Sequence, residues 1–171
     1  HISSNGYHWD NYIAVNDAGI LPLYSDIYST DLDEESKISE NNKIINSIMR
    51  IRDEAKYLDS ILVIDRGGDR RVLINDFLHI EQKFIIRQKG NRHLFYNGKS
   101  LPLKDVYKET KLNYSFEFTK VNKNRKYKKK FKAGAVQVFM PETNLKEKIN
   151  TPLWLVTSQE KGKGFSWFLA F

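Results

Sequence analysis

The pattern of apolar and polar positions along the chain predicts alternating strands and helices. Residues 7–15 and 20–28 are rich in aromatic and β-branched side chains, and residues 16–19 between them form a turn sequence. We expect an antiparallel hairpin there. Because Pro22 lies inside the second segment, that strand should lie at a sheet edge or contain a bulge.

Two amphipathic helices are predicted next. The acidic residues 30–35 suit a helix N-terminus. Apolar residues then recur at helical spacing, which indicates a helix with one buried side. The members of this stripe are Ile44, Ile48, Ile51, Ala55 and Leu58. Residues 70–82 show a second pattern of the same kind, in which His79 is expected to lie at the surface.

Between the two helices, residues 61–64 form an unbroken apolar run. Such a run predicts a short strand that is covered on both faces, as central strands of α/β sheets are. Asp65, Arg66 and two glycines follow at its end, where ligands gather in open α/β sheets. Asp65 is therefore either a site residue or a cap for the next helix, and the local pattern favours neither.

A second short apolar strand, residues 84–86, is followed by three cationic residues. Arg87, Lys89 and Arg92 lie close to a glycine, and their side chains can bind phosphate oxygens. Ordinary solvated charge explains the same pattern equally well. We expect either a phosphate-facing edge or a solvated surface here.

Residues 94–150 change character and predict short antiparallel strands, with a tight turn at residues 97–99. Within them, residues 123–132 contain 7 basic side chains of 10 and no acidic one. We expect this run to be a hairpin tip or a mobile loop that contacts DNA phosphates, with an affinity that falls as salt rises. The candidate DNA-binding residues in it are Arg125, Lys126, Lys128, Lys129 and Lys130.

The end of the chain is again apolar. Residues 152–157 predict a buried strand, and residues 165–171 are mostly aromatic and aliphatic. Since an apolar aromatic terminus without a polar cap is unusual, we expect the chain to be a fragment.

Composition limits the class of protein. With 171 residues and 40% hydrophobic content, the chain should form one domain. The absence of Cys excludes disulfides and thiolate metal sites. The sequence contains neither a membrane-spanning apolar run nor a signal pattern, so we expect a cytoplasmic protein with no membrane partner.

The charge is unevenly distributed. Residues 1–60 contain 5 basic and 11 acidic side chains, whereas residues 61–171 contain 23 basic and 10 acidic. Such asymmetry suggests that the second half faces a polyanion, most commonly nucleic acid. A solvated lysine-rich surface is the alternative.

Three motifs resemble those of the bacterial DDE transposases, insertion-sequence enzymes whose ribonuclease-H-like core contains a β-strand insertion. They are residues 65–69, residues 84–89 together with Arg92, and residues 152–158. The resemblance implies an α/β fold, with an incomplete ribonuclease-H-like mixed sheet, flanking helices and an inserted antiparallel β subdomain. Within a single domain, the partial core would comprise residues 1–93 and 151–171, and the insertion about 94–150.

The resemblance also implies an activity. Transposases of this family hold two divalent ions, Mg²⁺ or Mn²⁺, between two Asp and one Glu, and they cleave and transfer DNA strands at transposon ends. Asp65 matches the second Asp as a catalytic metal ligand. The first Asp should lie before His1, and the Glu on a helix after Phe171, so we expect this chain alone to be inactive. Asp10 and Asp17 are weak substitutes for the first Asp.

DNA contacts are implied as well. Transposon-end and target DNA would be contacted by Arg66, Arg87, Lys89 and Arg92, and the full protein is compatible with a homodimer. Trp154 either stacks on an unpaired base or packs in the core, and core packing is the favoured interpretation. Two alternatives to a transposase stay open, namely a non-catalytic DNA-binding module of the same fold and a related host nuclease.

Overall fold

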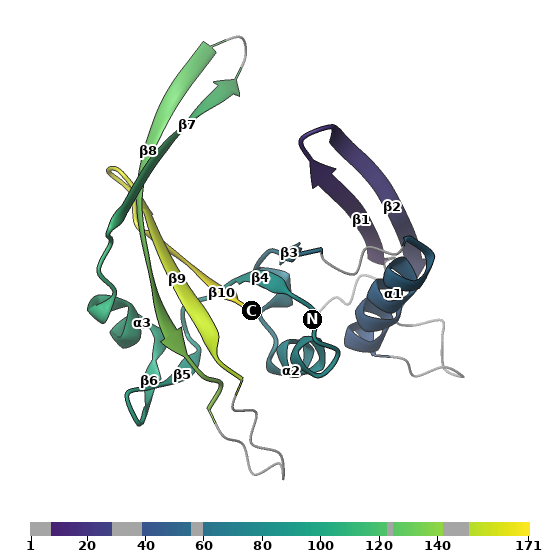
Figure 1. Ribbon diagram of the computed structural model, residues 1–171, viewed down its shortest axis with the longest axis horizontal. Coiled ribbons are helices and arrows are strands. Elements are labelled where there is room, and N and C mark those ends of the chain that lie inside the picture. Colours follow the sequence, from purple (N-terminus) through teal and green to yellow (C-terminus); the bar gives the residue numbers. More distant parts are fainter. Residues whose placement is uncertain (1–7, 29–38, 56–59, 123–124, 142–150) are drawn as a thin grey trace, which may run out of the picture. The chain divides into compact units, whose positions relative to one another are not determined.

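The computed structural model has mixed α/β structure, with three α-helices among the residues described (Figure 1). The chain divides into two compact units, His1–Asp59 and Ser60–Phe171. Among the described residues, no helix has the length and apolar content needed to cross a bilayer. The described residues are 8–28, 39–55, 60–122, 125–141 and 151–171.

The first unit contains the predicted hairpin. Strands β1 (His8–Asn16) and β2 (Gly19–Tyr28) pair antiparallel, and Asn16 Oδ1 accepts a hydrogen bond from the Ala18 N–H across the turn at 2.9 Å. The pairing register shifts between Tyr12 and Ile13, at the point where Ile13 lies opposite Pro22. The bulge predicted from this proline is therefore confirmed.

The first unit also contains helix α1 (Glu40–Ala55). Ser39 caps it, because its Oγ accepts a hydrogen bond from the Asn42 N–H at 3.2 Å. Ile48 is buried and Ile44 is half-buried, so the predicted apolar stripe is confirmed in this part. The acidic residues 30–35 and Leu58 lie outside the described residues.

The second unit is built on a six-stranded sheet. Its strand order is β3 (Leu62–Ile64), β4 (Phe84–Arg87), β10 (Phe165–Ala170), β9 (Leu153–Glu160), β8 (Arg125–Val138) and β7 (Tyr114–Asn122). Strands β3 and β4 are parallel, and the other neighbours are antiparallel. The connection between β3 and β4 contains the 3₁₀ turn η1 (Arg66–Gly68) and helix α2 (Arg71–His79).

Smaller elements follow β4. They are a hairpin of β5 (His93–Tyr96) and β6 (Lys99–Pro102), helix α3 (Leu103–Val106) and the 3₁₀ turn η2 (Tyr107–Glu109). Asn97 and Gly98 both have positive φ at the tip of this hairpin, which is the geometry that an Asn-Gly turn favours. The predicted tight turn is therefore confirmed.

One face of the six-stranded sheet is covered. The Phe77 ring of α2 contacts Phe84 at 5.8 Å between centroids, and the Tyr107 ring of η2 contacts Trp167 at 5.5 Å. The strand residues on this covered face have no exposed surface at its centre. They include Ile86, Leu153, Leu155, Val138 and Leu169.

The opposite face, which we call the open face, contains no buried residue among those in register across it. Paired residues of neighbouring strands lie on the same face. Two neighbouring rows of paired residues lie on the open face. One row contains Val63, Ile85, Ala170 and Trp154, and the next contains Phe168, Val156 and Ala135.

The prediction that residues 61–64 are covered on both faces is wrong. β3 is the terminal strand of the described sheet, and Val63 is 73% exposed on the open face. An unbroken apolar run indicates a strand, but the position of that strand in the sheet depends on pairing partners that the run does not specify.

The prediction of a mobile loop is wrong for most of the basic run, which begins at the end of a hairpin and continues as one of its strands. Residues 125–132 belong to strand β8, and only residues 123–124 of the run lie outside the described part of the chain. β8 pairs with β7 over residues 125–133 and with β9 over residues 131–138. The β7–β8 hairpin therefore extends past β9 as a two-stranded arm (Figure 1).

Candidate functional site

Asp65 lies directly after β3 and caps the 3₁₀ turn η1. Its Oδ1 accepts a hydrogen bond from the Gly67 N–H at 2.8 Å, while its carbonyl oxygen accepts from the Gly68 N–H at 3.1 Å. The side chain is exposed at the carboxyl end of the strand. The structure thus shows the capping role, and the role of metal ligand stays a prediction.

Gly68 is needed for this turn. A Cβ at position 68 would lie 2.7 Å from the Ile64 Cγ2, closer than real Cβ atoms approach. The backbone of the turn therefore packs directly against the Ile64 side chain of the preceding strand. Its geometry depends on the pair of glycines that follow Asp65 in the sequence.

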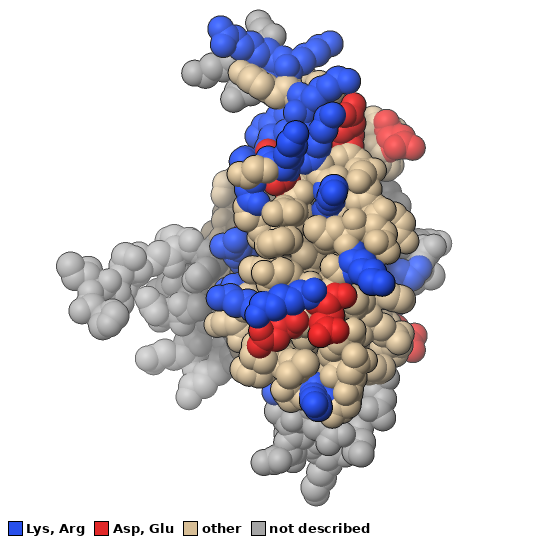
Figure 2. All heavy atoms as spheres, turned by 90° about the vertical axis from the view of Figure 1, so that its left-hand side faces the viewer, with Lys and Arg blue, Asp and Glu red and all other residues tan. Residues whose placement is uncertain are grey.

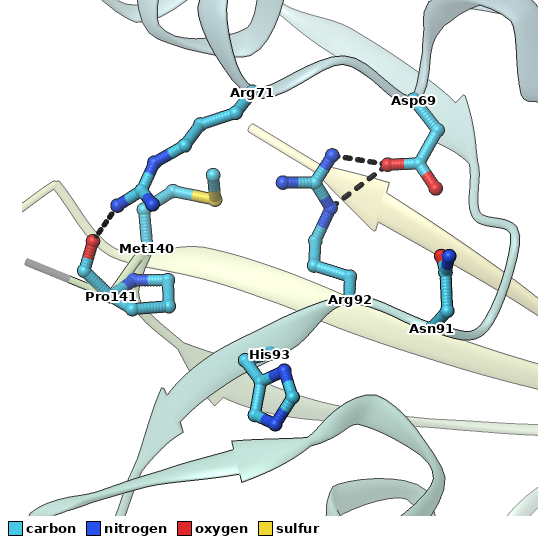
Figure 3. Close-up of a pocket in the computed structure, with 7 residues that line it drawn as sticks. All are labelled: Asp69, Arg71, Asn91, Arg92, His93, Met140 and Pro141. Atoms are coloured by element: carbon cyan, nitrogen blue, oxygen red, sulfur yellow. Dashed lines mark hydrogen bonds and ion pairs between the residues drawn. The ribbon is translucent and has the colours of Figure 1, made fainter. Parts of the chain in front are cut away.

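Asp69, four residues further on, is buried in an ion pair with Arg92. The Arg92 Nε lies 2.8 Å from the Asp69 Oδ1, and a second guanidinium nitrogen donates to the same oxygen (Figure 3). The Asp69 side chain is 2% exposed and the Arg92 side chain is 11% exposed. Asp69 Oδ2 also accepts from the Lys89 N–H at 2.8 Å, and Gln88 Oε1 accepts from Arg92 at 2.9 Å.

This network joins the start of α2 to the loop after β4. Gln88 is itself buried, and its backbone N–H donates to the Trp167 carbonyl at 2.8 Å. Each buried polar group of the network has a partner of suitable charge or polarity. Arg92 therefore stabilises the fold at this position, and its predicted contact with DNA would require this ion pair to open.

A pocket of about 270 Å³ lies beside this ion pair. In Figure 3, Arg71 enters it from α2 and donates to the Pro141 carbonyl, while Arg92 is directed toward Asp69. The Arg71 Nε is buried, and it has no hydrogen-bond partner among the described residues. The remaining lining residues are Asn91, His93 and Met140.

The other cations predicted at this end of the sheet differ in their exposure. Arg66 is exposed in η1, and Lys89 is exposed in the loop after β4. Arg87 lies on the open face opposite Phe168, and its Nε is buried without a hydrogen-bond partner in the described part of the chain. Arg66 and Lys89 are therefore accessible to a phosphate, whereas the Arg87 Nε is not.

The resemblance implies two Mg²⁺ or Mn²⁺ ions, which several carboxylates would have to hold. Asp65 offers the hard oxygen ligand that Mg²⁺ and Mn²⁺ prefer. Over the described ranges, however, no three His, Asp or Glu side chains come together in a group that could hold an ion. Asp10 and Asp17 lie in the first unit, in β1 and in the turn after it, as expected from the sequence. The described side chains alone do not make a two-metal centre.

The β7–β8 hairpin is the most basic part of the structure. Its paired residues, 114–122 and 125–133, contain seven basic side chains and one acidic side chain, Glu117. In Figure 2, Lys and Arg side chains gather at the upper end of the molecule, where this hairpin lies. The local field therefore favours an anionic partner.

Register divides the side chains of the hairpin between two faces. The first, which we call the lysine face, presents four lysines of β8 opposite Ser115, Glu117, Thr119 and Val121 of β7. These lysines are Lys126, Lys128, Lys130 and Lys132, and all four are exposed. Lys128 Nζ lies 3.2 Å from the Glu117 carboxylate, so this one acidic side chain partly neutralises the face.

The second face of the hairpin, which we call the aromatic face, continues the open face of the sheet. The Phe131 ring lies between those of Phe116 and Phe118, at 5.3 and 5.0 Å between centroids and nearly parallel to both. Tyr114 and Tyr127 lie on the same face and are exposed. Arg125, Lys120 and Lys129 add positive charge to it.

Lys129 is engaged on this face with Glu160 of β9, at 2.8 Å. The hydrogen bond raises the pKa of Lys129 and lowers the pKa of Glu160 from their ordinary values. Of the five basic candidates predicted in this run, Lys129 is therefore paired with an acidic residue of β9 and Lys128 with one of β7. Lys129 contributes to the shape of the hairpin as well as to its charge.

Trp154 is 48% exposed on the open face, so the favoured interpretation, core packing, is wrong. Its neighbours Leu153 and Leu155 are buried on the covered face. The strict alternation of a strand explains this difference. A base-stacking role for Trp154 is untested and stays a prediction.

Lys132 and the phenylalanines of β7 were not predicted as candidate site residues from the sequence. Phe116 and Phe118 alternate with polar residues, and Lys126, Lys128 and Lys130 alternate with Tyr127 and Lys129. This period of two is a strand signal, and it also places residues on faces. The dense positive charge of the run obscured it.

Comparisons with models of protein families and with curated protein sequences gave no match to the chain.

Proposed function

We propose that the chain is part of the catalytic core of a DDE transposase, in which it binds DNA and supplies Asp65 as one carboxylate of the metal site. The observation that supports this most strongly is the arrangement around Asp65. A parallel pair, β3 and β4, is joined through α2, and Asp65 follows the first of these strands. Ligand sites in such sheets form at the carboxyl ends of the strands.

The elements after β4 support the same proposal. The ribonuclease-H-like fold that the resemblance implies contains an inserted antiparallel β subdomain at this point of the chain. Here, β8, β9 and β10 extend the sheet beyond β4 through antiparallel pairing. The agreement lies in the order of elements and in the direction of the strands.

The chemistry of the proposed reaction needs more than Asp65. Paired divalent ions stabilise both the attacking and the leaving oxygen when a phosphodiester is cleaved, so several carboxylates have to converge on them. Asp69 is not a substitute, because its carboxylate is occupied by Arg92 and by the Lys89 N–H. In this proposal, Asp65 contributes one hard oxygen ligand, and the other ligands come from outside the described residues.

The lysine face of the β7–β8 hairpin supports DNA binding. Four lysines at every second position form a row about 20 Å long, given the rise of roughly 3.4 Å per residue in a strand. Such a row neutralises phosphates without reading base sequence. The proposed interface with duplex DNA is therefore sequence-independent over this hairpin.

The sequence of the encoding gene on both sides of the chain tests the proposal. An Asp on a strand before residue 1 and a helix with Tyr, Arg, Glu and Lys after residue 171 would support a transposase. Their absence would favour a non-catalytic DNA-binding module, in which Asp65 acts as the η1 cap that the structure shows. A host nuclease would retain the carboxylates but would not transfer strands.

An assay of the purified chain provides a second test. We expect it to bind duplex DNA but to leave the DNA intact in Mg²⁺ or Mn²⁺, since Asp65 alone cannot hold two ions. Metal-dependent cleavage that disappears in Asp65→Asn would show that the chain contains a complete site, and it would contradict the proposed division of ligands.

A further inference from the structure

We propose that the aromatic face of the β7–β8 hairpin binds the bases of single-stranded DNA by stacking. This inference deepens the proposed function and rests on the DNA binding proposed there. It assigns different tasks to the two faces of one hairpin. The lysine face binds phosphates, and the aromatic face binds unpaired bases.

The register of the hairpin gathers the rings. Phe116 lies directly opposite Phe131, and Phe118 lies opposite Lys129, so all of them belong to one face. Three parallel rings at centroid separations near 5 Å form a short stack in which Phe131 is the middle member. Phe116 and Phe118 are still 48% and 47% exposed. About half of the surface of each residue is therefore accessible to a partner.

The position of the stack is unusual for apolar side chains. These rings lie where the hairpin begins to extend past β9. Phe131 is the last residue of β8, on the side of the hairpin tip, that pairs with β9. Exposed aromatic clusters of this kind mark interaction sites more often than solvated surface. The stack is therefore not part of the core, and we expect a binding partner to cover it.

The charge around the stack selects the chemistry of that partner. Arg125, Lys120 and Lys129 lie on the same face, and the four lysines of the opposite face lie one strand thickness away. Proteins that bind single strands combine such a positive groove with rings on which successive bases stack. A second copy of the hairpin would bring two strongly positive surfaces together, so self-association through this face is disfavoured.

The open face continues from the stack toward Trp154. Trp154 lies opposite Gln137, six residues along β8 from Phe131, which is about 20 Å at roughly 3.4 Å per residue. Ala133 and Ala135 lie between them on this face, and their small side chains leave the path open. A single strand that follows β8 would therefore meet rings at both ends of the path.

The test measures binding of an oligothymidylate and of a duplex of the same length to three forms of the whole chain. These are the unmodified chain, the double variant Phe116→Ile/Phe118→Ile and the double variant Phe116→Tyr/Phe118→Tyr. Isoleucine keeps strand propensity and apolar area but removes the ring, whereas tyrosine keeps the ring. We expect the isoleucine variant to bind the oligothymidylate roughly ten-fold more weakly or worse, the tyrosine variant to bind it normally, and both to bind the duplex unchanged.

Each other result overturns the inference. Unchanged oligothymidylate binding in the isoleucine variant would show that the rings contact no base. Equal losses for both DNA forms would show that the rings only maintain the hairpin. If size-exclusion chromatography shows a dimer of the unmodified chain that the isoleucine variant loses without any loss of single-strand affinity, the partner is a second copy and the inference fails. If the unmodified chain binds the duplex but not the oligothymidylate, the inference fails and the proposed function stands, whereas binding of neither DNA contradicts both.

Discussion

Arg92 and Asp69, 23 positions apart in the sequence, form a buried ion pair that fastens the loop after β4 to the start of α2. Two further hydrogen bonds hold the pair in place. The Lys89 N–H donates to Asp69, and Arg92 donates to the Gln88 side chain. Within the sequence motifs that resemble a transposase, these two residues therefore have an architectural task. Asp65, by contrast, keeps its carboxylate at the surface.

The first prediction concerns this ion pair. Asp69→Asn leaves the Arg92 guanidinium largely buried without a countercharge, which should lower the free energy of unfolding by about 3–5 kcal/mol. Urea denaturation followed by circular dichroism measures the change. Lys108→Ala, which breaks the exposed Lys108–Asp105 pair in the same unit, is the control and should leave the midpoint nearly unchanged. Equal effects of both variants would contradict a buried, structural Asp69–Arg92 pair.

The second prediction concerns the turn after Asp65. Gly68→Ala places a methyl group against the Ile64 side chain, so it should destabilise the second unit by about 1–3 kcal/mol, as other overpacked sites do. Gly164→Ala is the matched control, because a Cβ there meets no atom within 4 Å. Denaturation midpoints of the two variants give the comparison. A Gly68→Ala variant as stable as the control would mean that the turn relaxes freely.

The third prediction concerns pH and the first unit. Burial raises the pKa of Tyr12 to about 12, with further contributions from the nearby Asp10 and Asp26 carboxylates. In the unfolded chain this phenol ionises near pH 10. The stabilisation that comes from keeping Tyr12 neutral is therefore fully present below pH 10 and is lost as pH rises toward 12. Tyr12→Phe should reduce this alkaline loss of stability of the hairpin and α1. An unchanged pH profile would show that another group is responsible.

The fourth prediction concerns the one acidic residue of the hairpin. Glu117 lies on the lysine face, opposite Lys130 and close to Lys128. Glu117→Gln removes this negative charge, so it should tighten duplex binding roughly three-fold at low salt and less at high salt, where charges are screened. Asp105→Asn, on α3, is the control and should have no effect. Weaker binding by Glu117→Gln would contradict phosphate contact on this face.

Much of the local structure follows from sequence patterns. The β1–β2 hairpin, its proline bulge, the turn at Asn97 and helix α2 all depend on neighbouring residues, so local pattern predicts them. The exposure of Val63 does not follow in this way. It depends on what packs against that face of the sheet, and a local pattern does not specify the packing partner.

The candidate site was less predictable than the fold. Arg92 was predicted to bind phosphate because it follows a strand together with other cations. Its ion pair with Asp69 joins residues that are distant in the sequence, so a local pattern does not reveal it. The basic run looked like a loop because like charges repel, but pairing with β7 and β9 supports it as a strand. Trp154 could have been placed correctly, since alternation puts it on the face opposite Leu153 and Leu155.

The salt dependence of duplex binding tests most directly the claim that the β7–β8 hairpin is a DNA interface. The slope of log affinity against log salt should become flatter by roughly one for each lysine that contacts a phosphate. The variant removes the four lysines of the lysine face by substitution with Ala, at Lys126, Lys128, Lys130 and Lys132. The charge-matched control substitutes four exposed lysines elsewhere in the same unit, namely Lys99, Lys104, Lys108 and Lys111. A flatter slope in the first variant alone would support phosphate contact by the lysine face. Equal slopes in the two variants would contradict it.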